Sequence, residues 1–446
     1  MYNFPKNLYT DVRIEDVYLN QISYRNGELM QSLNRKQKGA FIRVYDGQRW
    51  YYSSTTNTNN IQEEIDKLTL MARENEKILE NPVVKKFEIN KGEYAYFQDN
   101  NILNVKYEDK HELLRSYFPI LEGTEEIKMW TGVYLDRRIV KEFYSSKGAN
   151  LKFDYQTCAI AFRYNLNVDG KTLSGKFDKT GIDFKELKGL EEDIKKIIER
   201  DIDFVKNAKP VKPGKYTVVF SPVATGVFTH ESFGHKSEAD FMIGDKTMMK
   251  EWAIGKKVGA DNLSIVDTGD ILGSGFVPFD DEGTKARKTY LIKDGILTGR
   301  LHSTITAESL NEELTGNARA LNFEFEPIVR MTTTYIEPGD KTKEELISEV
   351  KLGILVEDIN HGSGMSTFTI APNISYMIRD GKIAEPVNIS VITGNVMETL
   401  YEIDGISKEI EILTFALGGC GKIEQFPLPV RSEEHTSELQ SQDGLS

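Results

Sequence analysis

The first half of the chain alternates between strand and helix patterns. Two β-rich runs, 40–45 and 49–52, flank an Asp-Gly pair that is typical of hairpin turns. Apolar residues then recur at helical spacing over 61–72, and strand patterns dominate 127–178. The clearest helical stripe follows and comprises Leu187, Leu190, Ile194, Ile197, Ile198, Ile202 and Val205. These patterns predict a sheet flanked by helices.

The second half is dominated by strand patterns. A β-branched run at 216–220 precedes Pro222, a residue that suits the first turn of a helix. The proline- and glycine-rich segment 207–214 separates the two halves. We therefore predict an α+β chain. Its N-terminal mixed α/β domain would span 1–209, and a β-dominated domain resembling an antiparallel barrel or sandwich would span 210–430.

Composition limits the class of protein. A chain of 446 residues with 39% hydrophobic residues is long enough for two folded domains. A net charge of −13, without a cluster of Lys and Arg, argues against a nucleic-acid partner. No apolar run reaches the roughly 18 residues of a membrane span, and the first residues do not resemble a signal peptide. Because the sequence holds two cysteines, Cys158 and Cys420, we expect no disulfide framework and a reducing cytoplasm.

Residues 431–446 differ from the rest of the chain. They are polar and unpatterned, and their sequence matches the translation of a common sequencing-adapter DNA. We expect the gene sequence to run into adapter near residue 430, which makes 431–446 a non-native tail. His435 is therefore excluded from the candidate sites.

The heptapeptide Thr-His-Glu-Ser-Phe-Gly-His at 229–235 holds the main candidate chemistry. His230 and His235 offer imidazole nitrogens to a divalent metal, and Glu231 can take a proton from a water that the metal activates. Their spacing of five residues would leave the histidines about 140° apart on a regular helix. A π-bulge, or a helix that loosens at Gly234, would bring them together. The structural alternative is a buried, hydrogen-bonded His230 and an exposed His235.

Cys420 lies among three glycines in Leu-Gly-Gly-Cys-Gly-Lys, a setting that suits a metal ligand, a reactive thiolate or a small residue in a tight loop. Two histidines and a cysteine with an open fourth position form an accepted catalytic zinc set. No Gly-x-Ser-x-Gly motif supports serine hydrolase chemistry. We expect Cys158 in the core, and His302 and His361 in structural roles or near a substrate carbonyl. We expect Asp280-Asp281-Glu282 to form a solvated turn rather than a calcium site. The segment 83–115 is polar, and we expect its Lys and Glu residues to be solvated and His111 to lie on its surface.

Three separated blocks carry a family resemblance. They are the His230–His235 motif after a strand, Arg-Met-Thr-Thr-Thr-Tyr-Ile-Glu-Pro-Gly-Asp at 330–340, and Gly-Gly-Cys-Gly-Lys at 418–422. Together with the opening at 11–15 and the hairpin at 39–53, they resemble the TldD branch of the TldD/PmbA ("modulator of gyrase") metallopeptidases. The likeness extends over almost the whole chain, up to about residue 430.

The resemblance implies a cytoplasmic, zinc-dependent peptidase in which His230, His235 and Cys420 hold Zn²⁺ and Glu231 is the general base. Family members form homodimers, or heterodimers with a PmbA-like paralogue, and enclose a chamber that admits unfolded or short peptides. Two other interpretations stay open. One is a non-catalytic, peptide-binding partner subunit with a structural metal, and the other is a cysteine-dependent hydrolase that uses Cys420.

Overall fold

The computed structural model describes residues 2–364, 366–409, 413–414, 417–428, 431–432 and 440–441. Its N-terminal part is built on a seven-stranded sheet with the order β3-β2-β1-β5-β6-β4, in which β7 also pairs with β6. The strands are β1 (Tyr9–Arg25), β2 (Glu28–Tyr45), β3 (Trp50–Thr55), β4 (Lys91–Tyr94), β5 (Ile127–Ser145), β6 (Asn150–Val168) and β7 (Lys171–Gly181). The predicted hairpin is confirmed, because β2 and β3 pair antiparallel across the turn at Asp46 and Gly47.

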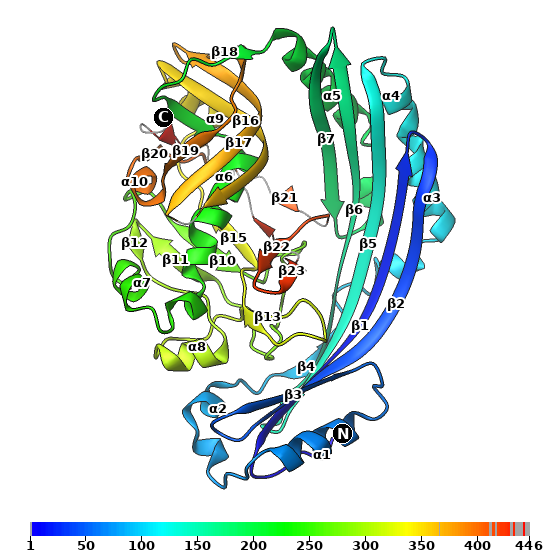
Figure 1. Ribbon diagram of the computed structural model, residues 1–446, viewed down its shortest axis with the longest axis vertical. Coiled ribbons are helices and arrows are strands. Elements are labelled where there is room, and N and C mark those ends of the chain that lie inside the picture. Colours follow the sequence, from blue (N-terminus) through cyan, green and yellow to red (C-terminus); the bar gives the residue numbers. More distant parts are fainter. Residues whose placement is uncertain are drawn as a thin grey trace.

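Helices cover the outer face of this sheet (Figure 1). They are α1 (Ile61–Met71), α3 (Tyr107–Ser116), α4 (Phe118–Glu122) and α5 (Glu191–Asn207), with the short turns η2 (Ile102–Asn104) and η3 (Phe184–Leu187). By contrast, η1 (Ile78–Glu80) and α2 (Pro82–Lys86) lie at the lower end of the sheet, and α2 packs against the helix Thr304–Ser309 of the C-terminal part. The helical stripe predicted near 186–206 is confirmed by α5, whose Ile194 and Ile198 are buried against the sheet.

The expectation that segment 83–115 is solvated was wrong for its second half. Helix α3 buries Leu114 and Lys110, and Lys110 Nζ lies 2.6 Å from Asp136 Oδ2 in a fully buried ion pair. His111 is also buried, and its Nδ1 lies 2.8 Å from the hydroxyl of Tyr24. The partners of these polar residues come from distant strands, so their burial leaves no trace in the local sequence pattern.

The C-terminal part contains two larger sheets with the orders β20-β25-β9-β16-β17-β18-β8, with β19 on β17, and β12-β11-β10-β15-β24-β21. The strands are β8 (Lys209–Pro210), β9 (Thr217–Phe220), β10 (Ile265–Thr268), β11 (Thr289–Lys293), β12 (Ile296–Leu297), β13 (Ala318–Arg319), β14 (Ile328–Val329), β15 (Thr333–Ile336), β16 (Leu352–Gly364), β17 (Thr367–Arg379), β18 (Lys382–Asn388), β19 (Ile392–Asn395), β20 (Ile403–Gly405), β21 (Leu413–Thr414), β22 (Cys420–Lys422), β23 (Gln425–Leu428), β24 (Arg431–Ser432) and β25 (Gln440–Ser441). The helical segments are α6 (Pro222–Thr229), η4 (His230–Gly234), η5 (His235–Ser237), η6 (Ala239–Met242), α7 (Lys246–Glu251), α8 (Thr304–Ser309), α9 (Lys343–Ser348) and α10 (Val396–Tyr401). The α+β fold class is confirmed, although the described strands form open sheets and no closed barrel.

Segment 433–439 and segment 442–446 of the predicted tail lie outside the described residues. The domain boundary between 209 and 210 and the non-native origin of 431–446 stay predictions. Strand β8 lies at that boundary and pairs with β18, so the predicted linker 207–214 contains an edge strand of the C-terminal part. No helix among the described residues is long and apolar enough to cross a membrane.

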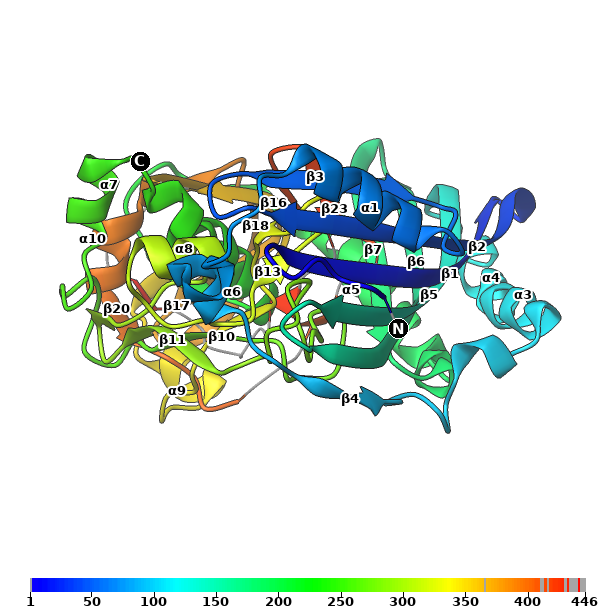
Figure 2. The same ribbon diagram turned by 90° about the horizontal axis from the view of Figure 1, so that it is seen from below.

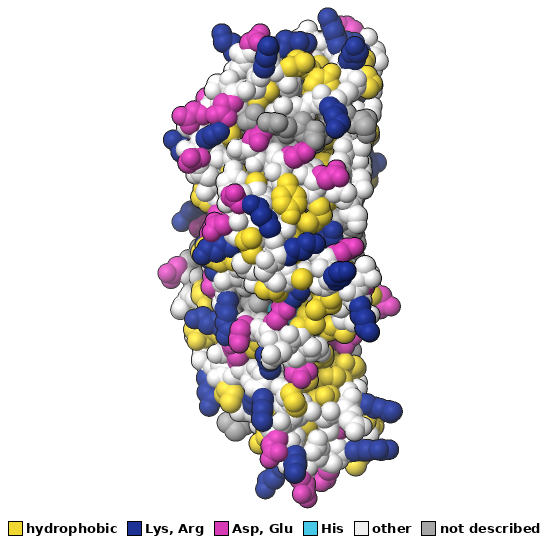
Figure 3. Space-filling model, turned by 90° about the vertical axis from the view of Figure 1, so that its left-hand side faces the viewer, with side chains coloured by type: hydrophobic (Ala, Val, Ile, Leu, Met, Phe, Trp, Pro, Cys, Tyr) yellow, Lys and Arg dark blue, Asp and Glu magenta, His cyan; other side chains and the backbone are white. Residues whose placement is uncertain are grey.

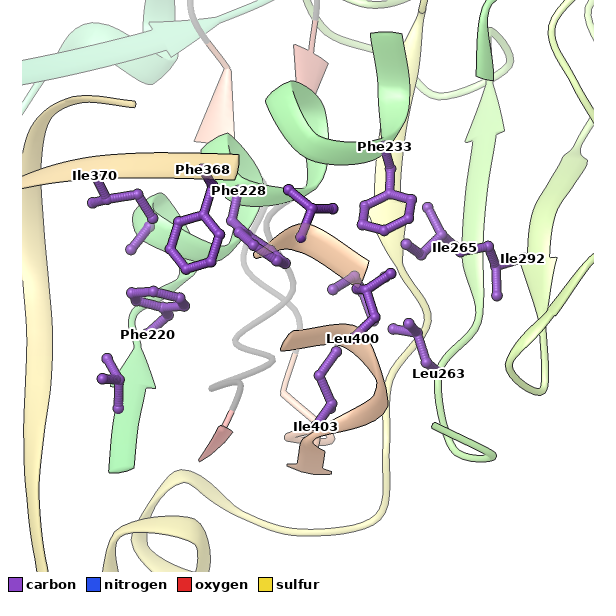
Figure 4. Packing of buried hydrophobic residues seen from close by; sticks show 14 of the residues in the cluster. Phe220, Phe228, Phe233, Leu263, Ile265, Ile292, Phe368, Ile370, Leu400 and Ile403 are labelled. Atoms are coloured by element: carbon purple, nitrogen blue, oxygen red, sulfur yellow. The ribbon is translucent and has the colours of Figure 1, made fainter. Parts of the chain in front are cut away.

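The C-terminal core packs around α6. Phe228 of α6 lies edge-on to Phe368 of β17, with 5.0 Å between ring centroids, and also contacts Phe220 of β9 (Figure 4). Phe233, in η4, packs on Trp252, with 5.8 Å between the ring centroids. Burying each such phenylalanine contributes about 1.5–3 kcal/mol. Aromatic contacts therefore fix both α6 and the turn that follows it.

The two parts meet through buried charges. The long strands of the N-terminal sheet curve around one side of the C-terminal part, and Figure 2 shows the same arrangement from below. Arg43 of β2 donates to Asp11 at 2.7 Å and to Glu282 at 3.0 Å, while Lys141 of β5 pairs with Asp281. The expectation that Asp280-Asp281-Glu282 forms a solvated turn was therefore wrong, because all three are buried.

Candidate metal centre

The histidine motif begins as a regular helix and then widens. Ser221 caps α6 by accepting a hydrogen bond from the backbone N–H of Ala224, and Pro222 occupies the first turn, as predicted. The segment from His230 to Gly234 is a π-helix, the distortion that the five-residue spacing requires. The rings of His230 and His235 consequently lie 5.0 Å apart, centroid to centroid, at an interplanar angle of 84°.

Gly234 has a different role from the one expected. Its backbone is helical, with φ −52° and ψ −55°, so it is not a point at which the helix loosens. A Cβ atom at this position would lie 1.8 Å from the sulfur of Met331. Glycine is needed here because the Met331 side chain lies directly against the helix. The helix distortion that brings the histidines together is the π-turn.

Three donor atoms converge at this turn. One nitrogen each of His230 and His235 and the sulfur of Cys420 lie within 4.8 Å of one another. The Cys420 sulfur is 3.0 Å from His235 Nε2, and β22 brings it across 185 residues of sequence. A tetrahedral zinc ion, with bonds of about 2.0–2.3 Å, places its donors roughly 3.3–3.8 Å apart. The two-histidine, one-cysteine set therefore fits Zn²⁺ after small side-chain movements.

Burial and neighbouring charges set the protonation of the two histidines in opposite directions. Burial, then His235 and Arg330, lower the pKa of His230 to about 3, so its imidazole is neutral and its lone pair is available. Burial also opposes the charged form of His235, but hydrogen bonds to Cys420 and Glu238 outweigh it and raise its pKa to about 10. A divalent cation would supply the same attraction to the Cys420 thiolate and displace this proton.

Glu231 lies between the two histidines in sequence. Burial raises the pKa of its carboxyl group, and His235 opposes this shift. A glutamate with a raised pKa is a better proton acceptor near neutral pH than an exposed one.

Glu238 and Lys422 contact the candidate centre, and neither was identified from the sequence. Nδ1 of His235 donates to Glu238 Oε2 at 3.1 Å, and Lys422 Nζ lies 3.0 Å from the same oxygen. Lys422 also donates to Asp240 at 2.6 Å and to the carbonyl of Val329 at 2.9 Å. This arrangement fixes the tautomer in which His235 presents Nε2 to the ligand position. The local signal, a glutamate three residues after a histidine, is too common to be recognised.

Arg330 explains why the block at 330–340 belongs to the site. Its fully buried guanidinium donates to the carbonyl of Cys420 at 2.7 Å and to the carbonyl of Gln425 at 3.2 Å. Gln425 in turn donates to the carbonyl of Glu326 at 2.9 Å. These hydrogen bonds hold the hairpin of β22 and β23 against Arg330, with the Cys420 sulfur facing the histidines.

The other candidate residues lie outside this centre. Cys158 is fully buried, as predicted, and burial raises the pKa of its thiol. His302 is buried and its Nε2 lies 2.9 Å from Glu312, so its role is structural. His361 is exposed and lies within β16.

Comparisons with known proteins identify the family. The model of the PmbA/TldA metallopeptidase C-terminal domain matches residues 213–429, and that of PmbA/TldA metallopeptidase domain 1 matches residues 10–75. A metalloprotease of Synechocystis sp. is 32% identical over 435 residues, which cover 95% of this chain and 91% of that protein. This chain belongs to the PmbA/TldD metallopeptidase family. A zinc metalloprotease TldD homologue of Saccharolobus solfataricus is 28% identical over 90% of this chain and 89% of its own length.

Solved structures share the fold. TldE from Thermococcus kodakarensis superposes with a TM-score of 0.76 at 16% identity, over 98% of this chain and 97% of that one. A candidate modulator of a DNA gyrase from Thermotoga maritima gives a TM-score of 0.78 at 20% identity, over 98% and 95% of the two chains. The family assignment confirms the resemblance drawn from the three sequence blocks. The match to the C-terminal domain model ends at residue 429, and the predicted non-native tail would begin at residue 431.

Proposed function

We propose that this protein is a zinc-dependent peptidase in which His230, His235 and Cys420 hold the metal and Glu231 is the general base. The observation that carries the proposal is the convergence of two imidazoles and one thiol at a π-turn directly beside a half-buried glutamate. Relatives called metalloproteases and a zinc metalloprotease support it.

His230, His235 and Cys420 would hold Zn²⁺, which would supply Lewis-acid polarisation of a peptide carbonyl and a pKa of about 7 for the attacking water. The residues of the chain supply the remaining chemistry. Glu231 accepts a proton from the attacking water and delivers it to the leaving amine. Glu238 keeps His235 in one tautomer throughout, because its carboxylate accepts the Nδ1–H.

The proposed substrates are short or unfolded peptides, and the proposed setting is a cytoplasmic homodimer or heterodimer with a PmbA-like paralogue. An extended peptide could add to an exposed strand edge, where backbone hydrogen bonds tolerate varied side chains. The similarity in fold to TldE makes a partner subunit of the same architecture a specific candidate.

The alternative is a non-catalytic partner subunit with a structural metal. A structural zinc site is closed by four protein ligands, whereas a catalytic site keeps one position open. The metal-ligand group among the described residues has three members, which favours the catalytic interpretation. A cysteine-dependent hydrolase is the weaker alternative, and inhibition by thiol alkylation but not by chelators would favour it.

The test is Glu231→Ala, with the exposed Glu398→Ala as a matched control. We expect Glu231→Ala to keep its metal and to lose peptide hydrolysis by about 10²–10⁴-fold. The control should retain both. Full hydrolysis in Glu231→Ala would refute the assigned base, and metal-loaded protein without any hydrolysis of unfolded peptides would favour the binding subunit.

A further inference from the structure

A cleft of ≈ 490 Å³ lies between the long N-terminal sheet and two loops of the C-terminal part. Its sheet side is formed by β1, β2, β5 and β6, and its loop side by residues 321–323 and 417–418. We call it the sheet-face cleft. Gly418 is two residues before Cys420, so one wall of the cleft runs directly into the metal centre.

Two arginines dominate the sheet side. Leu19 of β1 pairs with Arg35 of β2 on one side and with Arg137 of β5 on the other. Directly paired residues point to the same face of a sheet, so both guanidinium groups project into the cleft beside Leu19. Neighbouring strands are about 4.8 Å apart, which puts the two arginine Cα atoms roughly 10 Å apart.

The charges of these arginines are not balanced. Among the described residues neither Arg35 nor Arg137 has an ion-pair partner, and the described lining of the cleft contains no Asp or Glu. Arg43, further along β2 on the same face, is instead paired with Asp11 and Glu282. On the molecular face in Figure 3, basic and acidic side chains are interspersed. In a chain with 69 acidic and 56 basic residues, a lining with two arginines and no acidic residue is locally basic.

The rest of the lining suits an extended chain. Val17, Leu19 and Leu135 supply aliphatic surface on the sheet side, and Phe323 supplies an aromatic ring from the opposite loop. The backbone N–H of Leu321, in the same loop, donates to Gln425 Oε1 at 2.7 Å. That contact joins the loop to the hairpin that holds Cys420, so the cleft and the candidate metal centre share this wall.

We propose that the sheet-face cleft binds an acidic segment of the peptide substrate, with Arg35 and Arg137 receiving side-chain carboxylates. Arginine binds carboxylates through charge-assisted and often bidentate hydrogen bonds. The inference deepens the proposed function, because the bound segment would lead into the catalytic centre, but binding itself requires no hydrolysis. Acidic peptides are thus the favoured substrate class.

The test measures peptide binding by calorimetry on the full-length Glu231→Ala protein. The probes are two peptides with blocked ends that differ only in having Glu or Gln at alternate positions. We expect the Glu peptide to bind about tenfold more tightly, and its advantage to shrink at high salt. Arg137→Gln and Arg35→Gln should each reduce binding of the Glu peptide about five- to tenfold and leave the Gln peptide unchanged.

Arg163→Gln is the matched control, because Arg163 lies on the same face of the sheet but pairs with Asp178 at 2.7 Å. It should bind the Glu peptide as tightly as the parent protein. A charge reversal, Arg137→Glu, should prefer a Lys peptide, and this gain of binding cannot arise from misfolding.

Equal binding of the Glu and Gln peptides, or losses in Arg163→Gln as large as in Arg137→Gln, would overturn the inference. A Gln peptide that binds strongly with a free C-terminus but weakly with a blocked one would also overturn the inference. The cleft would then bind a terminal carboxylate rather than side-chain carboxylates. Intact acidic-peptide binding in a protein that never hydrolyses peptides would refute the proposed function and leave the cleft assignment standing.

Discussion

Gly234→Ala tests the packing that shapes the metal centre. The backbone at this position is helical and accepts alanine, so the whole cost comes from the new methyl group. That group would lie 1.8 Å from Met331 Sδ and 2.9 Å from Met331 Cε, whereas ordinary contacts begin at 3.4 Å. The sulfur must therefore retreat by about 1.6 Å (3.4 − 1.8) inside a fully buried environment.

Overpacking of this kind lowers the free energy of unfolding by about 1–3 kcal/mol, and the higher helix propensity of alanine offsets up to about 1 kcal/mol of this loss. We expect Gly234→Ala to lower the free energy of unfolding by about 1–2 kcal/mol, measured by urea denaturation. It should also weaken metal binding, because His235 follows directly. Gly418→Ala is the control, since no atom lies within 4 Å of its added Cβ.

A double variant separates the clash from other causes. Met331→Ala alone should cost about 2–5 kcal/mol, because it leaves a cavity. In Gly234→Ala/Met331→Ala the new methyl group fills part of that cavity, so the total loss should be smaller than the sum of the single losses by at least about 1 kcal/mol. Additive losses, or a Gly234→Ala protein as stable and as metal-rich as the parent, would refute the close-approach argument.

Two further predictions concern buried charges. Glu238→Gln should weaken zinc affinity about 10–100-fold in chelator competition, since the amide holds His235 less strongly; unchanged affinity would remove Glu238 from the site. Lys141→Met should destabilise the protein by about 3 kcal/mol at pH 7, because it breaks a buried pair with Asp281. Burial raises the pKa of Asp281, but Lys141 and Arg13 outweigh burial and lower it. The stability that this carboxylate contributes is therefore present above the pKa it has in the unfolded chain. That stability is lost as the pH falls through the lower pKa of the folded protein. The difference between Lys141→Met and the parent in urea denaturation should therefore shrink below about pH 4, and a constant difference would contradict the pairing.

The metal site could be predicted from sequence because its decisive signal is local. A five-residue histidine spacing is incompatible with a regular helix, and the π-turn from His230 to Gly234 resolves that conflict. The start of α6 could also be predicted locally, since Pro222 suits the first turn of a helix. The role of Cys420 as a third ligand could not be predicted from its spacing in the sequence. The family resemblance connected it to the histidines.

What sequence could not show depends on partners far along the chain. Asp281 and Glu282 have the composition of a solvated turn, and they are buried because Lys141 and Arg43 approach from strands 140 and 239 residues away. The role of Gly234 depends on Met331 in the same way. Strand β2 was recognised only over its buried end, since its first residues are largely exposed and show no alternation of apolar and polar positions.

Metal content per chain tests the central claim most directly. It should be determined by elemental analysis on protein purified without a histidine tag, alongside Cys420→Ser and the buried control Cys158→Ser. The account predicts about one zinc per chain in the parent and in Cys158→Ser, and none in Cys420→Ser. A well-folded parent protein without bound metal, or a Cys420→Ser protein that keeps its zinc, would contradict the three-donor site.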